Sequence, residues 1–433
     1  MLAILIFGSI FGLIAFTRLP LGFVMMGAGA VGISVLHPRG LSAGLAITEQ
    51  QIIDLATNYH FSVLPLFILM GVFVVRAGLA AELFNAARCW LGHLNGGVGM
   101  ATIVACGGFS AMTASSAAAA ATMTKIAVPE MDKANYDKGF AAGSVAAGGT
   151  MGILIPPSGA LIIYALLVEK SVGEMFVAGM LPGALQMLLY LLVMVIVAMW
   201  RPQWAPAGPK HSWGDRLRSL KGVWGIVALF GLIMVGLVQG WFTANEAGGI
   251  GAGGAFLFAL ARRKLTFRIF CDTLLEAAKL STMIFVVAAG AMVLNQFINL
   301  SGITGNTVEF IQSLGLAPWQ VIGCLILFYI FLGCLMDGFA MLFLTVPIIA
   351  PVVVGMGYDL VWWGIVTVMV VEISLITPPV GLNVFILRAM LPEVPITKVF
   401  KGILPYLAAD VVRLGLVLLI PAIVLWLPSM MSH

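Results

Sequence analysis

Long apolar runs separated by short polar segments dominate the chain, and this pattern predicts an all-α membrane protein that crosses the bilayer many times. About 20 consecutive apolar residues span a hydrocarbon core as a helix. The segments that fit this length are residues 2–17, 21–36, 61–78, 137–167, 175–199, 222–241, 244–261, 280–299, 360–391 and 404–427. Paired prolines interrupt two of them, 137–167 and 360–391.

Two further apolar stretches, residues 98–130 and 319–355, do not fit as single spans. Small or polar residues break each of them near its middle, at Thr113–Ser116 and at Met336–Gly338. Each stretch is compatible with two full spans or with one re-entrant hairpin. Both arrangements return the chain to the side from which it started, so the predicted topology does not depend on the choice.

Composition supports the bilayer as the solvent of this chain. Hydrophobic residues make up 61% of it and charged residues only 9%, whereas soluble domains carry about 25% charged residues. No polar stretch is long enough to fold as a soluble domain, and a net charge of +4 does not indicate a nucleic-acid partner. The sequence contains no HExxH, GxSxG or phosphate-binding Gly-Lys-Ser/Thr motif, so we expect neither an enzyme nor an ATP-driven pump.

The distribution of Lys and Arg predicts the orientation in the membrane. Two loops, 201–221 and 262–279, are rich in these residues and lie two spans apart, so both fall on one side. Positive loops remain in the cytoplasm, which places both termini outside in a multi-pass protein. The N-terminus lacks the basic segment of a cleavable signal peptide.

An internal duplication organises the chain. Tyr136-Asp137 precedes Pro156-Pro157, and 222 residues later Tyr358-Asp359 precedes Pro378-Pro379. Five crossings between the equivalent starts of the copies, at 61 and 281, predict two inverted repeats, as in alternating-access transporters. The predicted regions are a two-span scaffold with an outer loop (1–60), repeat 1 (61–200), a linker with two scaffold spans (201–279) and repeat 2 (280–433).

Amphipathic segments at 79–94 and about 303–316 precede the two broken stretches, and we expect them to be arm helices at the membrane interface. Such a pair suits a transport domain that moves relative to its scaffold.

Polar residues inside the predicted membrane region gather at the breaks. The offset of 222 residues pairs Ser115 with Asp337 and Thr150 with Glu372, so one repeat offers hydroxyls where the other offers carboxylates. Hard cations such as Na⁺ prefer oxygen ligands, and prolines free backbone carbonyls by unwinding a helix. Helix N-termini at hairpin tips suit an anion. Asp410 and Arg413, three residues apart, are expected to form a structural pair.

At these motifs the chain resembles the large, DctM-like membrane subunit of the tripartite ATP-independent periplasmic (TRAP) transporters. The segments that carry the resemblance run through nearly the whole chain in order. They are Leu64-Pro-Leu-Phe-Ile-Leu-Met-Gly71, Thr113–Ala118 leading to Val128-Pro129, Gly152-Ile-Leu-Ile-Pro-Pro-Ser158, Met336-Asp337 with Ala340-Met-Leu-Phe-Leu-Thr-Val-Pro347, and Glu372-Ile-Ser-Leu-Ile-Thr-Pro-Pro-Val-Gly-Leu-Asn383.

The resemblance implies an elevator-type, Na⁺-coupled importer of organic acids, such as carboxylates or sulfonates, in the bacterial inner membrane. It also implies two partners, a periplasmic substrate-binding protein and a small four-helix membrane subunit. No additional four-helix region precedes the first span, so we expect the small subunit to be a separate polypeptide.

Carried onto this chain, the family's sodium sites fall where the hairpin tips meet the unwound helices. The expected sodium-binding residues are Thr113, Ser115, Ser116, Gly149 and Thr150 in repeat 1, and Asp337, Gly338, Glu372, Thr377 and Gly381 in repeat 2. Candidate contacts of the substrate are Ser116, Pro156, Ser158, Pro378 and Asn383. Na⁺ is the only metal expected, and it acts as coupling ion rather than as a cofactor.

This chain departs from the family pattern at two positions. The first tip reads Thr113-Ala-Ser-Ser where a glycine often separates hydroxyl residues, and Lys125 stands at a usually small or polar position. Two alternative functions remain open at this stage. One is a self-sufficient Na⁺/organic-anion symporter, and the other is a non-transporting membrane subunit or intramembrane enzyme.

Overall fold

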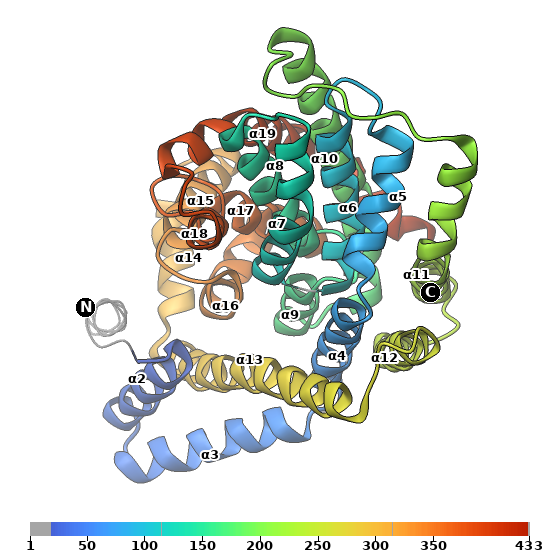
Figure 1. The fold of residues 1–433 in the computed structure, drawn as a ribbon. Helices are drawn as coiled ribbons and strands as arrows, with labels where there is room; N and C mark the ends of the chain where they lie inside the picture. The colour runs from blue at the N-terminus through green and yellow to red at the C-terminus, as the bar shows by residue number, and fades with distance from the viewer. Residues whose placement is uncertain (1–18, 114, 314, 432–433) are drawn as a thin grey trace.

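The computed structural model describes residues 19–113, 115–313 and 315–431, and helices are its only regular secondary structure (Figure 1). This confirms the predicted all-α class. The predicted span 2–17 lies outside the described residues. By length and composition, five described helical segments can cross a membrane, or six if a bent pair within α11 counts as one span. These five are Tyr59–Arg76, Val172–Trp200, Phe267–Ser301, Gly338–Gly355 and Ile396–Leu419.

One group of helices forms what we call the scaffold, which occupies the lower part of Figure 1 and, with α11, its right-hand side. It contains α2 (Leu21–Leu36), α3 (Leu41–Thr57), α4 (Val63–Arg76), α11 (Trp213–Val238), α12 (Ala244–Ala261) and α13 (Phe267–Ser301). Helix α13 packs against α2 and α4, and α12 packs against α4. A Cβ atom at Gly22 would lie only 2.5 Å from the Val286 carbonyl oxygen, so the absence of a side chain allows α2 to approach α13 closely.

The remaining helices form the body, in which the same order of elements occurs twice. Repeat 1 continues from α4 through α5 (Leu79–Leu91), α6 (Gly97–Thr113), α7 (Ser116–Lys133), α8 (Lys138–Thr150), α9 (Gly159–Leu167) and α10 (Val172–Trp200). Repeat 2 continues from α13 through α14 (Ile303–Ser313), α15 (Pro318–Gly333), α16 (Gly338–Gly355), α17 (Leu360–Ser374), α18 (Leu382–Met390) and α19 (Ile396–Leu419). Short helices are η1 (Tyr59–Ser62), η2 (Met151–Ile153), α20 (Ala422–Leu425) and η3 (Pro428–Met430).

The two repeats interlock within the body. Helix α7 of repeat 1 packs against α18 of repeat 2, and α16 of repeat 2 packs against α9 of repeat 1. Helix α8 lies along α19, and α10 contacts both α17 and α19. Each hairpin therefore lies against the interrupted helix of the other repeat, and neither repeat buries its apolar helices alone.

The structure differs from the expected loops in two places. Residues 37–60, expected as an outer loop, contain the helix α3. The helix expected over 280–299 begins much earlier, at Phe267, where the Thr266 hydroxyl accepts a hydrogen bond from the Ile269 amide at 3.3 Å. Both differences have one cause, because polar residues on an exposed helix face lower local hydropathy without preventing a helix. Helices α5 and α14 lie within the segments predicted to be arms.

Glycines bring the backbones of α8 and α19 into contact. A Cβ atom built at Gly402 would lie 2.2 Å from the Gly139 carbonyl oxygen, and one at Gly143 would lie 2.5 Å from the carbonyl carbon of Gly402. Backbone atoms cannot move aside as a flexible side chain can, so this crossing requires glycine. It is the closest approach that we identify between the two repeats.

We predict that Gly402→Ala destabilises the body, because overpacking a well-packed core costs about 1–3 kcal/mol. The measurement is the melting temperature of the purified protein in detergent. The matched control is Gly415→Ala in the same helix, since a Cβ atom there meets nothing within 4 Å. Equal melting temperatures for the two variants would contradict the proposed close crossing.

Candidate functional site

The tip of hairpin 1 joins α6 to α7 and presents hydroxyl groups. Ser115 has an extended backbone (φ −140°, ψ 111°), and its hydroxyl accepts a hydrogen bond from the Ala118 amide at 3.3 Å. This cap starts α7 at Ser116, which is partly exposed. Thr113 is buried and donates its hydroxyl hydrogen to the Ser110 carbonyl at 3.3 Å. Residue 114 is not among the described residues.

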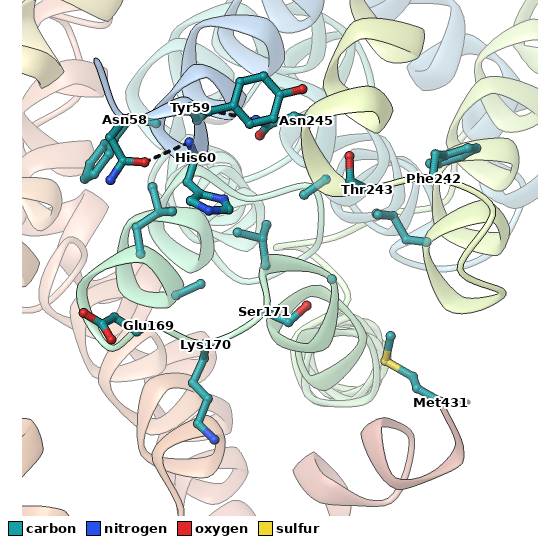
Figure 2. A pocket seen from close by; sticks show the side chains of 17 residues that line it. Asn58, Tyr59, His60, Glu169, Lys170, Ser171, Phe242, Thr243, Asn245 and Met431 are labelled. Atoms are coloured by element: carbon teal, nitrogen blue, oxygen red, sulfur yellow. Dashed lines mark hydrogen bonds between the residues drawn. The ribbon is translucent and has the colours of Figure 1, made fainter. Parts of the chain in front are cut away.

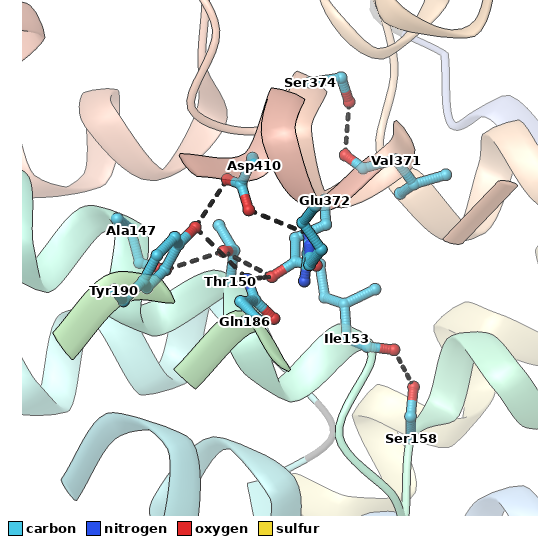
Figure 3. A network of polar contacts seen from close by, with 11 residues as sticks. Ala147, Thr150, Ile153, Ser158, Gln186, Tyr190, Val371, Glu372, Ser374 and Asp410 are labelled. Atoms are coloured by element: carbon cyan, nitrogen blue, oxygen red, sulfur yellow. Dashed lines mark hydrogen bonds and ion pairs between the residues drawn. The ribbon is translucent and has the colours of Figure 1, made fainter. Parts of the chain in front are cut away.

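The interrupted helix of repeat 1 ends beside this hairpin. A Cβ atom at Gly149 would lie 2.9 Å from the Ala120 Cβ, so the end of α8 contacts the first turns of α7. The chain then leaves the helix through η2 and a break at residues 154–158. Ser158 starts α9: its hydroxyl accepts from the Leu161 amide at 3.4 Å and donates to the Ile153 carbonyl (Figure 3). Pro156 is buried next to Gly179 of α10.

The tip of hairpin 2 has the same design with a carboxylate in place of the hydroxyl. Asp337 is exposed and accepts a hydrogen bond from the Phe339 amide at 3.1 Å, which caps α16. A Cβ atom at Gly338 would lie 2.7 Å from the Val371 side chain, and one at Gly333 only 2.0 Å from the Ser374 hydroxyl. The tip therefore rests on the last turn of α17, as the sequence predicts.

The interrupted helix of repeat 2 is more open at its break, residues 375–381. Pro378 is exposed, and Thr377 is partly buried with its hydroxyl donating to the Ile373 carbonyl at 2.6 Å. Gly381 has a positive φ of 60°, which favours glycine, and it starts α18. Asn383 is fully buried, and its side-chain amide donates to the Ala146 carbonyl of α8 at 3.3 Å.

The structure separates the substrate candidates into two groups. Ser116 and Pro378 are accessible to a ligand. Pro156, Ser158 and Asn383 are buried, and the polar groups of the last two contact backbone carbonyls of the body. The two breaks therefore have unequal accessibility although their sequences are similar.

A polar cluster lies inside the body at the crossing of four helices (Figure 3). The Glu372 carboxylate accepts hydrogen bonds from Thr150 at 2.8 Å, from Arg413 at 2.9 Å and from the Gln186 amide. Arg413 also lies 3.0 Å from Asp410, so the expected pair forms. Tyr190 donates its hydroxyl hydrogen to Asp410 at 2.6 Å. All of these side chains are fully buried.

The cluster lies where equivalent positions of the two repeats meet. Thr150 and Glu372, which are 222 residues apart, contact each other directly. An offset one residue longer than 222 aligns Gly179 with Gly402, and the same offset aligns Tyr190 with Arg413. Contact between equivalent residues places the cluster close to the axis that relates the repeats.

Sequence reasoning did not single out Gln186 or Tyr190. An amide or a phenol in an apolar helix is often an ordinary helix contact, so no local signal distinguished them. It also did not connect Asp410 and Arg413 with Glu372, because that contact depends on how α19 packs. An available signal was that α19 carries two charged residues inside a predicted span.

A large cavity lies elsewhere, between the scaffold and the body (Figure 2). Its volume is about 700 Å³, and its wall includes Asn58, His60, Glu169, Lys170 and Asn245. The charge distribution predicts that this is the outer side. None of the residues that the sequence predicts for ion or substrate binding is among the described residues that line it. We therefore do not assign the ion or substrate site to this cavity.

Comparisons with known proteins agree with this geometry. Residues 7–423 match the model of the family described as "Tripartite ATP-independent periplasmic transporter, DctM component". The chain is 34% identical to the C4-dicarboxylate TRAP transporter large permease protein DctM of Pseudomonas aeruginosa, over 93% of each chain. It is 27% identical to the sialic acid TRAP transporter large permease protein SiaM of Vibrio cholerae, over 98% of each chain.

Among solved structures, the YdaH transporter of Alcanivorax borkumensis has a similar fold. The TM-score is 0.61 at 14% identity, with 87% of this chain and 88% of that chain covered. This likeness concerns the fold alone. Because the family model covers nearly the whole sequence and the P. aeruginosa permease is similar along nearly its whole length, the chain belongs to the DctM family of TRAP transporter large membrane subunits.

Proposed function

We propose that this chain is the membrane permease of a Na⁺-coupled, binding-protein-dependent importer of an organic anion, and that it works by an elevator mechanism. The observation that carries this proposal is the crossed pairing of the hairpins with the interrupted helices, α7 with α18 and α16 with α9. It brings oxygen-rich tips and broken backbone together at two places. Broken backbone inside a membrane protein is tolerated where it lines a cavity or is buried in protein.

The proposed sodium sites lie at the two tips. In repeat 1 the ligands are oxygens of Thr113, Ser115, Ser116 and Gly149, and in repeat 2 they are oxygens of Asp337, Gly338, Thr377 and Gly381. Oxygen is the donor that Na⁺ prefers. Thr150 and Glu372 direct their oxygens to each other and to Gln186 and Arg413. We therefore assign these two residues to the framework of the body instead of to ion coordination.

The proposed substrate is a carboxylate or sulfonate. The relatives named above are described as transporters of C4-dicarboxylates and of sialic acid, both of which carry carboxylates. Ser116 and Pro378 are accessible near the N-terminal ends of α7 and α18, where helix dipoles favour an anion. The proposed partners are a small membrane subunit and a periplasmic binding protein that delivers the anion.

We predict that uptake into proteoliposomes requires three components and an inward Na⁺ gradient. The experiment reconstitutes the chain with its small subunit and measures accumulation of a labelled anion that the binding protein has been shown to bind. Accumulation should fall to background when the binding protein or the gradient is omitted. Robust uptake by the chain alone would instead favour a self-sufficient symporter, and no accumulation under any gradient would favour a non-transporting subunit.

We also predict that Asp337→Asn weakens Na⁺ activation of uptake by roughly tenfold or more, equivalent to about 1.4 kcal/mol. The substitution removes a charged ligand but retains the helix cap, since Asn caps as well as Asp. The measurement is the Na⁺ concentration that gives half-maximal uptake.

Asp359→Asn is the matched control, because Asp359 also caps a helix, accepting from the Val361 amide at 2.7 Å, but lies at the far end of α17 from the tip. An equal effect of the two variants would argue against an ion ligand at Asp337.

A further inference from the structure

The buried cluster contains more acid than base. Glu372, Asp410 and Arg413 are the charged residues among the buried side chains of the described part of the chain, and each is 0% exposed. Two phenols, Tyr190 and Tyr406, also lie near them and are neutral. If both carboxylates were ionised, one negative charge would lack a counter-charge in an apolar interior, where an unpaired charge is costly.

Neighbouring elements do not supply the missing charge. Helix α8 contributes the neutral hydroxyls of Thr150 and Ser144, and α10 contributes Gln186 and Tyr190. The thiol of Cys106 on α6 is also buried nearby, against Gly148 of α8. Arg413 contacts both acids through Nη2, while its Nε and Nη1 atoms are buried without a hydrogen-bond partner, and its single positive charge can balance only one of the two carboxylates.

The hydrogen bonds distinguish the two acids. Both oxygens of Glu372 accept hydrogen bonds, Oε1 from Thr150 and Gln186 and Oε2 from Arg413, as an ionised carboxylate requires. Asp410 accepts one hydrogen bond, from Tyr190 to Oδ2. Its Oδ1 atom is buried without a hydrogen-bond partner, although Arg413 lies 3.0 Å away. Asp410 therefore has an oxygen that can carry a hydrogen.

We propose that Asp410 holds a bound proton in the folded protein, so that the cluster is a neutral unit of Glu372⁻, Arg413⁺ and protonated Asp410. A proton suits this position better than Na⁺, because a metal ion at Oδ1 would lie against the guanidinium of Arg413 and would be repelled by it. In the proposed elevator mechanism, a neutral cluster would let the body cross the membrane without an uncompensated buried charge.

The test is infrared spectroscopy of the whole purified protein at neutral pH. The wild type should show the C=O stretching band of a protonated carboxyl group. The band should shift when the protein is made with aspartate that is isotope-labelled at its side-chain carboxyl carbon. It should be lost in Asp410→Asn and retained in Asp337→Asn, which changes the exposed acid at the tip of hairpin 2.

A second readout is the melting temperature. Asp410→Asn should have the same melting temperature as the wild type, because the amide is neutral like the protonated acid. Arg413→Gln should melt far lower, because it leaves Glu372 without its counter-charge. If Asp410→Asn fails to fold, Asp337→Asn decides: a band that shifts with labelled aspartate and is retained in this variant supports the proposal, and loss of the band there contradicts it.

Three results would overturn the proposal. One is the absence of a protonated-carboxyl band in the wild type, and another is a band that labelled aspartate leaves unchanged. The third is a melting temperature that rises with Na⁺ in the wild type but not in Asp410→Asn, which would mean that sodium balances the charge. None of these measurements depends on transport, so they are independent of the proposed function.

Discussion

The ion pair between Glu372 and Arg413 is the interaction on which the body depends. Both side chains are fully buried, so a charge that loses its partner there stays desolvated and uncompensated. The pair joins α17, which carries Glu372, to α19, which carries Arg413. Glu372 also accepts hydrogen bonds from Thr150 of α8 and Gln186 of α10, so the pair connects four helices. Breaking a buried pair by removing one partner costs about 3–5 kcal/mol, so the four helices are held in one arrangement. The two backbone breaks come shortly after α8 and directly after α17, so the arrangement of these helices also determines where the breaks lie.

The two repeats share a framework but differ in chemistry. Thr150 and Glu372 lie inside the body, where the hydroxyl of Thr150 donates a hydrogen bond to the carboxylate of Glu372. Ser115 and Asp337 lie at the tips of hairpin 1 and hairpin 2, where each of them caps a helix. An identical residue at both members of the first pair, Thr150 and Glu372, would place two carboxylates or two hydroxyls in contact near the axis. The divergence of the repeats therefore stabilises their crossing and leaves one tip more acidic than the other.

Sequence alone predicted those parts of the fold that depend on local chemistry. Glycine, proline and isolated polar residues locate the breaks, because each acts on its own stretch of backbone. Helix α3 was missed because Glu49, Gln50 and Asp54 lower its hydropathy, although helical structure requires only one apolar face. The cluster was missed because charge compensation between α17 and α19 is a tertiary property. The pairing of Thr150 with Glu372 was visible as an alignment, but their direct contact was not.

The ion pairs of the arm helix α5 contrast with the buried pair of the cluster. One ion pair, Arg88 with Glu130, ties this helix to hairpin 1, and another, Glu82 with Arg262, ties it to the scaffold. These pairs are partly exposed, and exposed pairs contribute only about 0–1 kcal/mol. Helix α5 follows Gly78, whose positive φ of 75° marks a turn with open space around it. The buried pair therefore costs more to break than the pairs at α5, so a movement of the body relative to the scaffold would break the pairs at α5 first.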